Sequence, residues 1–108
     1  MQSLGVKVVA AAGTPVQLTT GDTFCDEVFF QPMKSLSAAG TPPVDNVEPI
    51  YILSSSTAKG ATSTNVLFVL LPGQPGQTLR SRTPRGLNLK NIYIDADTSA
   101  DGALVSYV

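Results

Sequence analysis

The amino-acid sequence predicts an all-β protein, a single-domain β-sandwich or jelly-roll-like fold of about eight short antiparallel strands. Three observations support this prediction. Apolar and polar residues alternate over short stretches, which is the period of a strand with one buried face. Nine glycines and eight prolines interrupt these stretches, as turns do. No stretch keeps the helical period beyond one or two turns, so the strands must pack against one another.

The first half of the chain contains four predicted strands. They are expected at residues 5–11, 14–20, 28–31 and 50–54. Turn residues such as Gly13 and Gly21 separate the first three. Residues 33–49 lose the alternation and are rich in Pro, Ser and Ala. They are predicted to form a long loop or arm, which either contacts a neighbouring subunit or wraps its own sandwich.

The second half is expected to end in a β-hairpin around which the whole chain is organised. Residues 65–71 are apolar throughout and are predicted to be the most buried strand, and residues 77–82 form a further strand. Alternation resumes on both sides of a polar turn at residues 97–102. Two alternating stretches around an Asp- and Gly-containing turn are typical of a hairpin.

Length and charge limit the partners of the protein. The 108 residues suit one domain, residues 1–108. Charged residues make up 14% of the chain and the formal net charge is −1, so no long-range field draws the protein to nucleic acid or to a membrane surface. A surface of neutral Ser, Thr, Ala and Gln suits subunit packing, because burying such groups costs less than burying charges. The composition therefore favours a homo-oligomer or docking on a larger assembly.

The sequence offers few groups for catalysis or cofactor binding. It contains no His, which excludes His-based triads and His metal sites. Cys25 is the only cysteine, and it is expected to be a small buried hydrophobe without a disulfide partner. No Gly-rich phosphate loop is present. We therefore predict a protein that is not an enzyme and has no cofactor, metal or catalytic residue.

Two acidic patterns near the end of the chain offer alternatives to that prediction. Asp95, Asp97 and Asp101 with Gly102 partly match a calcium loop. Their spacing differs from the EF-hand series, so a solvated turn is the preferred interpretation. Asp95 and Asp97 could also form a hydrolase carboxylate pair. Nothing in the sequence gives them the different environments that such a pair needs.

Four of the seven basic residues gather in one segment, and they are Arg80, Arg82, Arg85 and Lys90. If residues 77–82 form a strand, Arg80 and Arg82 project from the same face. Arginine forks suit carboxylates, so Arg80, Arg82 and Arg85 are candidate partner-binding residues. The segment is short and lacks interleaved aromatics, which argues against nucleic acid. A solvated strand edge that discourages aggregation is the alternative interpretation.

Several short motifs occur in order along the chain. They are GTPVQLT at 13–19, IYI at 50–52, LPGQ at 71–74, NLKNIYIDA at 88–96 and DGALVSY at 101–107. Together they resemble a class of small β proteins of tailed bacteriophages, found among capsid decoration (cement) proteins and other virion structural parts. Each motif is short and made of common turn and strand residues. The chain departs from that class at residues 54–57 and in the length of residues 33–49.

The resemblance implies a non-enzymatic virion protein, made in the host bacterial cytoplasm and seated on the capsid exterior. Such a protein would bind the major capsid protein as a homo-oligomer, a trimer, and stabilise the shell. Residues 33–49, with Pro42, Pro43 and Val44, and residues 1–5 would reach neighbours, with the three arginines as polar anchors. A phage tail or head-fibre adaptor is the alternative. A carbohydrate-binding sandwich is more distant, because the chain has no Trp and only three Tyr.

Overall fold

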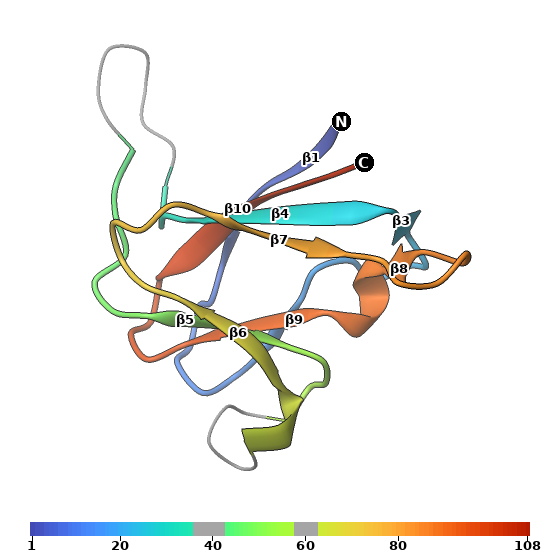
Figure 1. Ribbon diagram of the computed structural model, residues 1–108. Coiled ribbons are helices and arrows are strands. Elements are labelled where there is room, and N and C mark those ends of the chain that lie inside the picture. The colour runs from blue at the N-terminus through green and yellow to red at the C-terminus, as the bar shows by residue number, and fades with distance from the viewer. Residues whose placement is uncertain (36–42, 58–62) are drawn as a thin grey trace.

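The computed structural model describes residues 1–35, 43–57 and 63–108, and over these ranges the chain is all-β (Figure 1). The strands are β1 (Gln2–Val8), β2 (Val16–Gln17), β3 (Phe24–Cys25), β4 (Glu27–Pro32), β5 (Ile50–Leu53), β6 (Val66–Leu70), β7 (Gln77–Arg80), β8 (Leu87–Asn88), β9 (Tyr93–Ala96) and β10 (Gly102–Tyr107). Two single-turn 3-10 helices, η1 (Ser63–Asn65) and η2 (Leu89–Asn91), precede β6 and follow β8. Among the described residues, no helix has the length and apolar character needed to cross a membrane.

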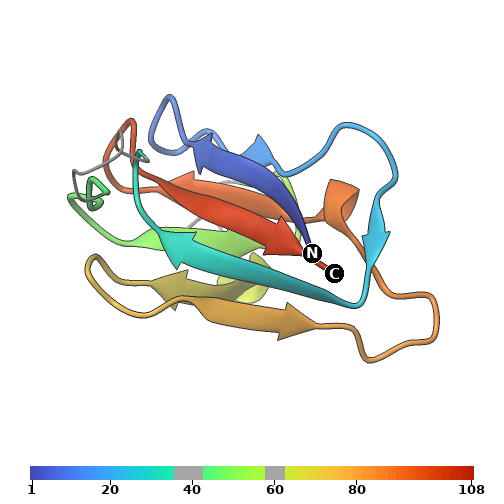
Figure 2. The same ribbon diagram turned by 90° about the horizontal axis from the view of Figure 1, so that it is seen from above.

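The strands form a sandwich of two four-stranded antiparallel sheets. One sheet has the order β1-β10-β4-β7 and the other β2-β9-β5-β6. A third, two-stranded sheet of β3 and β8 lies at one end of the sandwich (Figures 1 and 2). The predicted all-β sandwich is therefore confirmed.

The core lies between the two large sheets and follows the alternation of the strands. In β4, Val28 and Phe30 are fully buried, whereas Phe29 between them is only partly buried. The ring of Phe30 meets Phe68 of the opposite sheet edge to face, with centroids 5.6 Å apart. Such a contact adds about 0.5–1.5 kcal/mol to the burial of the two rings. The core positions thus come from strands with period-two patterns, as the sequence indicated.

The last two strands each lie inside a sheet, between two neighbouring strands. β10 pairs with β1 and β4, and β9 pairs with β2 and β5. The predicted closing hairpin is therefore wrong, because β9 and β10 belong to different sheets and the turn between them crosses from one to the other. The alternation was recognised correctly, but alternation shows which face of a strand is buried and not which strand lies beside it.

Two further predictions about strands are corrected. Residues 65–71 do not form the most buried strand, because Leu67 and Val69 of β6 are exposed. β6 is the outermost strand of its sheet, and only one of its faces turns to the core. β7 ends at Arg80 and not at residue 82. The two-residue strands β3 and β8 were not predicted, since strands this short carry no periodic signal.

The described part of the predicted long loop packs on its own sandwich. Val44 forms an isolated bridge with Ser35, in which Val44 N donates to Ser35 O over 3.0 Å and Lys34 N donates to Val44 O over 2.9 Å. Residues 43–49, called the corner segment below, then run beside the crossing between β9 and β10 (Figure 1). Residues 36–42, and with them the candidate Pro42, lie outside the described residues.

Candidate partner-binding surfaces

The two groups of candidate partner-binding residues lie at opposite ends of the sandwich. Arg80 sits opposite Glu27 at the start of β4, whereas Pro43 lines a pocket with Pro32 at the end of that strand. A strand rises about 3.3 Å per residue, so these positions are about 17 Å apart along β4. Figures 1 and 2 show the corner segment at one end and the connection after β7 at the other. The structure therefore does not bring the groups together.

We call the end with residues 80–90 the arginine end. There, Arg80 already forms an ion pair within the chain. Its Nε lies 3.1 Å from Oε1 of Glu27, and the two side chains are 74% and 45% exposed. Arg82 and Arg85 are exposed and form no ion pair with any described residue. The expectation that Arg80 and Arg82 share a strand face fails, because β7 ends at Arg80. Arg82 and Arg85 remain as cations that a partner could contact.

Asn88 organises the rest of the arginine end. Its Oδ1 accepts hydrogen bonds from the backbone N–H groups of Thr23 (3.1 Å) and Lys90 (3.2 Å), and its Nδ2 donates to Asp22 over 2.9 Å. The bond from Lys90 N caps η2. Asn88 is not among the residues predicted to form a site, although an Asn directly before a short helix is a recognisable capping signal. These contacts join β8 to the turn before β3.

Cys25 is buried beside this network, as predicted. It belongs to the hydrophobic core, and burial raises the pKa of its thiol, with the neighbouring Asp26 carboxylate raising it further. The thiol is therefore protonated at neutral pH and a poor nucleophile.

At the opposite end, buried polar groups fix the corner segment to the start of β10. Asn46 pairs with the backbone of Gly102 in both directions, its Oδ1 accepting from Gly102 N over 2.9 Å and its Nδ2 donating to Gly102 O over 2.8 Å. The Asp101 carboxylate accepts from the N–H groups of Val47 (3.0 Å) and Glu48 (2.9 Å). We call Asn46, Asp101 and Gly102 the corner cluster. Asp101 and Gly102 are buried, so the interpretation of Asp95, Asp97 and Asp101 with Gly102 as a solvated turn is wrong at these two positions.

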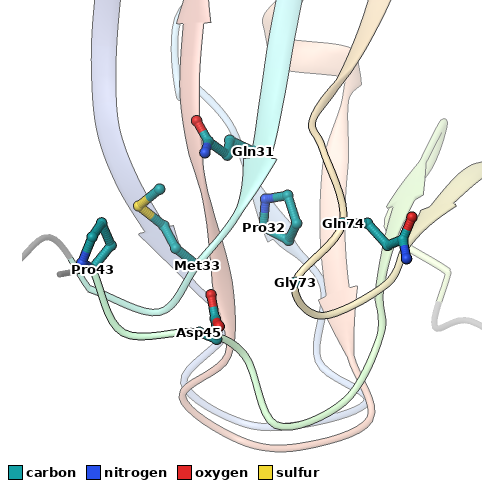
Figure 3. A pocket seen from close by; sticks show the side chains of 7 residues that line it. All are labelled: Gln31, Pro32, Met33, Pro43, Asp45, Gly73 and Gln74. Carbon is teal, nitrogen blue, oxygen red and sulfur yellow. The ribbon is translucent and has the colours of Figure 1, made fainter.

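A pocket of about 310 Å³ lies beside the corner cluster (Figure 3). It is lined by Gln31, Pro32, Met33, Pro43, Asp45, Gly73 and Gln74. Among the described residues that line it, Asp45 is the one that carries a charge, and the two Gln side chains add amide groups. The volume is at the lower limit of small-molecule sites, and it suits a single side chain of a partner protein.

The residues of the two acidic patterns lie in different environments. Asp95 is fully buried and accepts from the N–H groups of Gly13 (2.9 Å) and Ala96 (2.8 Å). β9 ends at Ala96, so Asp97 lies beyond the strand, is exposed and accepts from Tyr51 Oη over 2.8 Å. Across residues 1–35, 43–57 and 63–108, no three acidic or cysteine side chains form a group suited to a metal ion.

Five large aliphatic side chains are exposed on two segments that meet at the pocket. We call them the aliphatic band, and their exposed fractions are Val44 44%, Val47 60%, Leu67 44%, Val69 37% and Leu71 49%. The corner segment contributes the first two and the β6 region the other three. The two segments meet where Pro43 and Asp45 line the pocket together with Gly73 and Gln74. Part of the band could have been predicted from the sequence, because Leu67, Val69 and Leu71 lie in residues 60–79, which contain no charged residue.

No protein-family model, no curated protein and no solved structure matches this chain.

Proposed function

We propose that the protein is a non-enzymatic structural protein of a bacteriophage virion, of the capsid decoration type. It binds the shell of major capsid protein from outside, as a homo-oligomer, and stabilises that shell. The trimer implied by the resemblance would suit local threefold axes. The short sequence motifs support the assignment to a phage, and the aliphatic band supports the assignment to protein binding.

The aliphatic band supports a protein partner because exposed aliphatic side chains that gather in one region mark interaction surfaces. Val44, Val47, Leu67, Val69 and Leu71 all lie in the corner segment or beside β6. The pocket between these segments offers the Asp45 carboxylate to a basic side chain of the partner. A band of this kind with one acidic pocket suits a protein surface better than a small substrate.

The mechanism is additive contact. Burying apolar surface stabilises a complex by about 25 cal/mol per Å², so 200 Å² of band would contribute roughly 5 kcal/mol before the entropic cost of association. Many copies on one shell multiply that contribution and oppose the outward pressure of packaged DNA. The small core of a 108-residue chain is enough for this role, since the protein only has to keep its surface in shape.

The proposal is tested by mixing the purified protein with undecorated shells of the major capsid protein encoded in the same genome. Electron cryomicroscopy should show saturable density at threefold or quasi-threefold positions. Val47→Asp places a charge in the most exposed position of the band and should weaken binding at least tenfold. Thr20→Asp, which adds the same charge at an exposed position outside both the aliphatic band and residues 80–90, is the matched control and should bind like the wild type.

Two results would overturn the proposal. One is shells that stay bare at saturating protein, and the other is a Val47→Asp variant that decorates them as well as the control does. Density confined to tails would replace the capsid assignment with the tail or head-fibre alternative.

A further inference from the structure

The corner segment presents side chains of the binding surface although residues 43–49 lie outside every strand. Val44 and Val47 belong to the aliphatic band, and Asp45 between them lines the pocket. Irregular connections are usually the more mobile parts of a protein surface. A binding surface built on such a connection therefore has to be held in shape by residues outside it.

The backbone of Val47 is held from beneath by the Asp101 carboxylate. The side chain of Val47 is 60% exposed, the largest exposed fraction in the band. Its N–H group donates to both carboxylate oxygens of Asp101, over 3.0 Å each, and the N–H group of Glu48 donates to one of them over 2.9 Å. Hydrogen bonds to an ionised group are stronger than those between neutral groups. One carboxylate thus fixes two successive peptide groups of the corner segment.

Asp101 is itself held in place by the residue that follows β1. The C=O group of Asp101 accepts from Val9 N over 2.8 Å, and Val9 O accepts from Ala100 N over 2.8 Å. Ala100 has a φ of 75°, in the left-handed region that residues other than glycine rarely adopt. Strained residues of this kind persist where the surrounding contacts hold them. The carboxylate therefore stands on a fixed support.

Asp101 is fully buried, so a partner that contacts Val47 does not contact this carboxylate. Any effect of Asp101 on binding has to pass through the corner segment that it holds. A loop that is ordered before binding loses less conformational entropy when the partner arrives. A buried anchor can therefore raise affinity without touching the partner.

We propose that Asp101 is a positioning residue for partner binding, and that its carboxylate holds Val47 in the conformation that the partner meets. Val69 of the same band is placed differently, by the pairing of β6 with Tyr51 of β5. The inference rests on the proposed function, which supplies the partner. The hold on the corner segment can be measured in the free protein as well.

The binding test is a double-mutant cycle with undecorated capsid shells. Asp101→Asn keeps the size of the side chain but leaves one acceptor oxygen for two N–H groups, so it should weaken binding roughly fivefold. In a Val47→Ala background the same change should weaken binding less than about twofold, because the positioned side chain is gone. In a Val69→Ala background the roughly fivefold loss should remain. A general loss of folded protein would act equally in both backgrounds.

Ile92→Val is the control for stability. Ile92 is a buried core residue between η2 and β9, so the loss of one methyl group lowers the stability without touching the corner segment. This variant should bind shells like the wild type. Thermal unfolding of every variant checks that it is folded at the temperature of the binding test.

Hydrogen exchange of the free protein tests the hold itself. The amide protons of Val47 and Glu48 should exchange roughly tenfold faster in Asp101→Asn than in the wild type, because their acceptor is weakened. Ile92→Val should leave their exchange unchanged, since amides of a surface segment exchange by local opening.

Three results would overturn the inference and leave the proposed function standing. They are an Asp101→Asn variant that decorates shells as tightly as the wild type, a loss of binding that is equal in the Val47→Ala and Val69→Ala backgrounds, and unchanged exchange at Val47 and Glu48. Shells that stay bare with the wild-type protein would instead refute the proposed function, and with it the role of Asp101 in binding.

Discussion

The corner end and the arginine end look alike in sequence and differ in structure. Both are irregular connections with Pro, Gly, Asn and charged residues. At the corner, Asn46 and Asp101 are buried, Asn46 binds the buried backbone of Gly102, and Asp101 binds the partly buried N–H groups of Val47 and Glu48. At the arginine end, Arg82 and Arg85 are exposed and the Arg80–Glu27 pair lies at the surface. Burial, and not residue type, therefore separates polar groups that hold the fold from those left for solvent or a partner.

The physical reason is the availability of water. A buried backbone N–H that loses its acceptor keeps its full desolvation cost, whereas an exposed group finds water at once. Substitutions at the corner should therefore lower the free energy of unfolding strongly, and substitutions at the arginine end should lower it only weakly. Four comparisons of the free energy of unfolding, measured by urea denaturation, test this contrast.

The largest effect is expected for Asp101→Ala. It removes the acceptor of Val47 N and Glu48 N, which should cost about 2–3 kcal/mol. Asp101→Asn keeps the shape and one oxygen, and roughly half that loss is expected. A loss below about 0.5 kcal/mol for the alanine variant would mean that the buried carboxylate does not hold the corner.

Gly102→Ala should cost roughly 2 kcal/mol. A Cβ at this position would overlap the carbonyl oxygen of Lys7 on β1, so β1 would have to move away from β10. Gly21→Ala, near the arginine end, is the matched control because a Cβ there meets no atom within 4 Å. If the two variants are equally stable, the close approach of β1 to β10 is not a constraint.

The two asparagines compare the ends directly. Asn46→Ala leaves Gly102 N and Gly102 O unpaired in a buried place, and about 1–2 kcal/mol should be lost. Asn88→Ala removes a partly exposed cap of η2, for which about 0.5–1 kcal/mol is expected. The reverse ranking would contradict the argument from burial.

The smallest effect is expected at the Arg80–Glu27 pair. A double-mutant cycle of Arg80→Ala and Glu27→Ala should give a coupling below about 1 kcal/mol that shrinks with added salt, because both side chains are solvated. Arg82→Ala and Arg85→Ala should each change the stability by less than about 0.5 kcal/mol. A larger coupling, or one that salt leaves unchanged, would show that water is excluded from this surface.

The sequence was sufficient for fold class and most strands, because alternation and Gly/Pro punctuation are local signals. β4 and β5 match their predicted positions within one residue at each end. Strand pairing was not predictable, because it depends on contacts between residues far apart in the chain. The hairpin assigned to β9 and β10 failed for this reason.

The candidate site was predictable only in part. Val44 and Pro43 lie on a surface that the structure leaves open, but they were chosen for their place in a loop and not for their exposure. The corner cluster was missed because burial of Asp101 and Asn46 depends on two segments 55 residues apart, and neither segment alone predicts it. The exposure of Leu67 and Val69 was missed because an apolar run suggests a buried strand. β6 is instead an edge strand.

The central position of β9 and β10 has a consequence for how the protein is made. β1 and β4 are joined only through β10, and β2 and β5 only through β9. In chain order, these two strands follow every strand that they connect. During translation neither large sheet can be completed until residues 93–108 have left the exit tunnel. Until then β1 and β2 lack the strands with which they pair, and both sheets are completed by the same short stretch of chain.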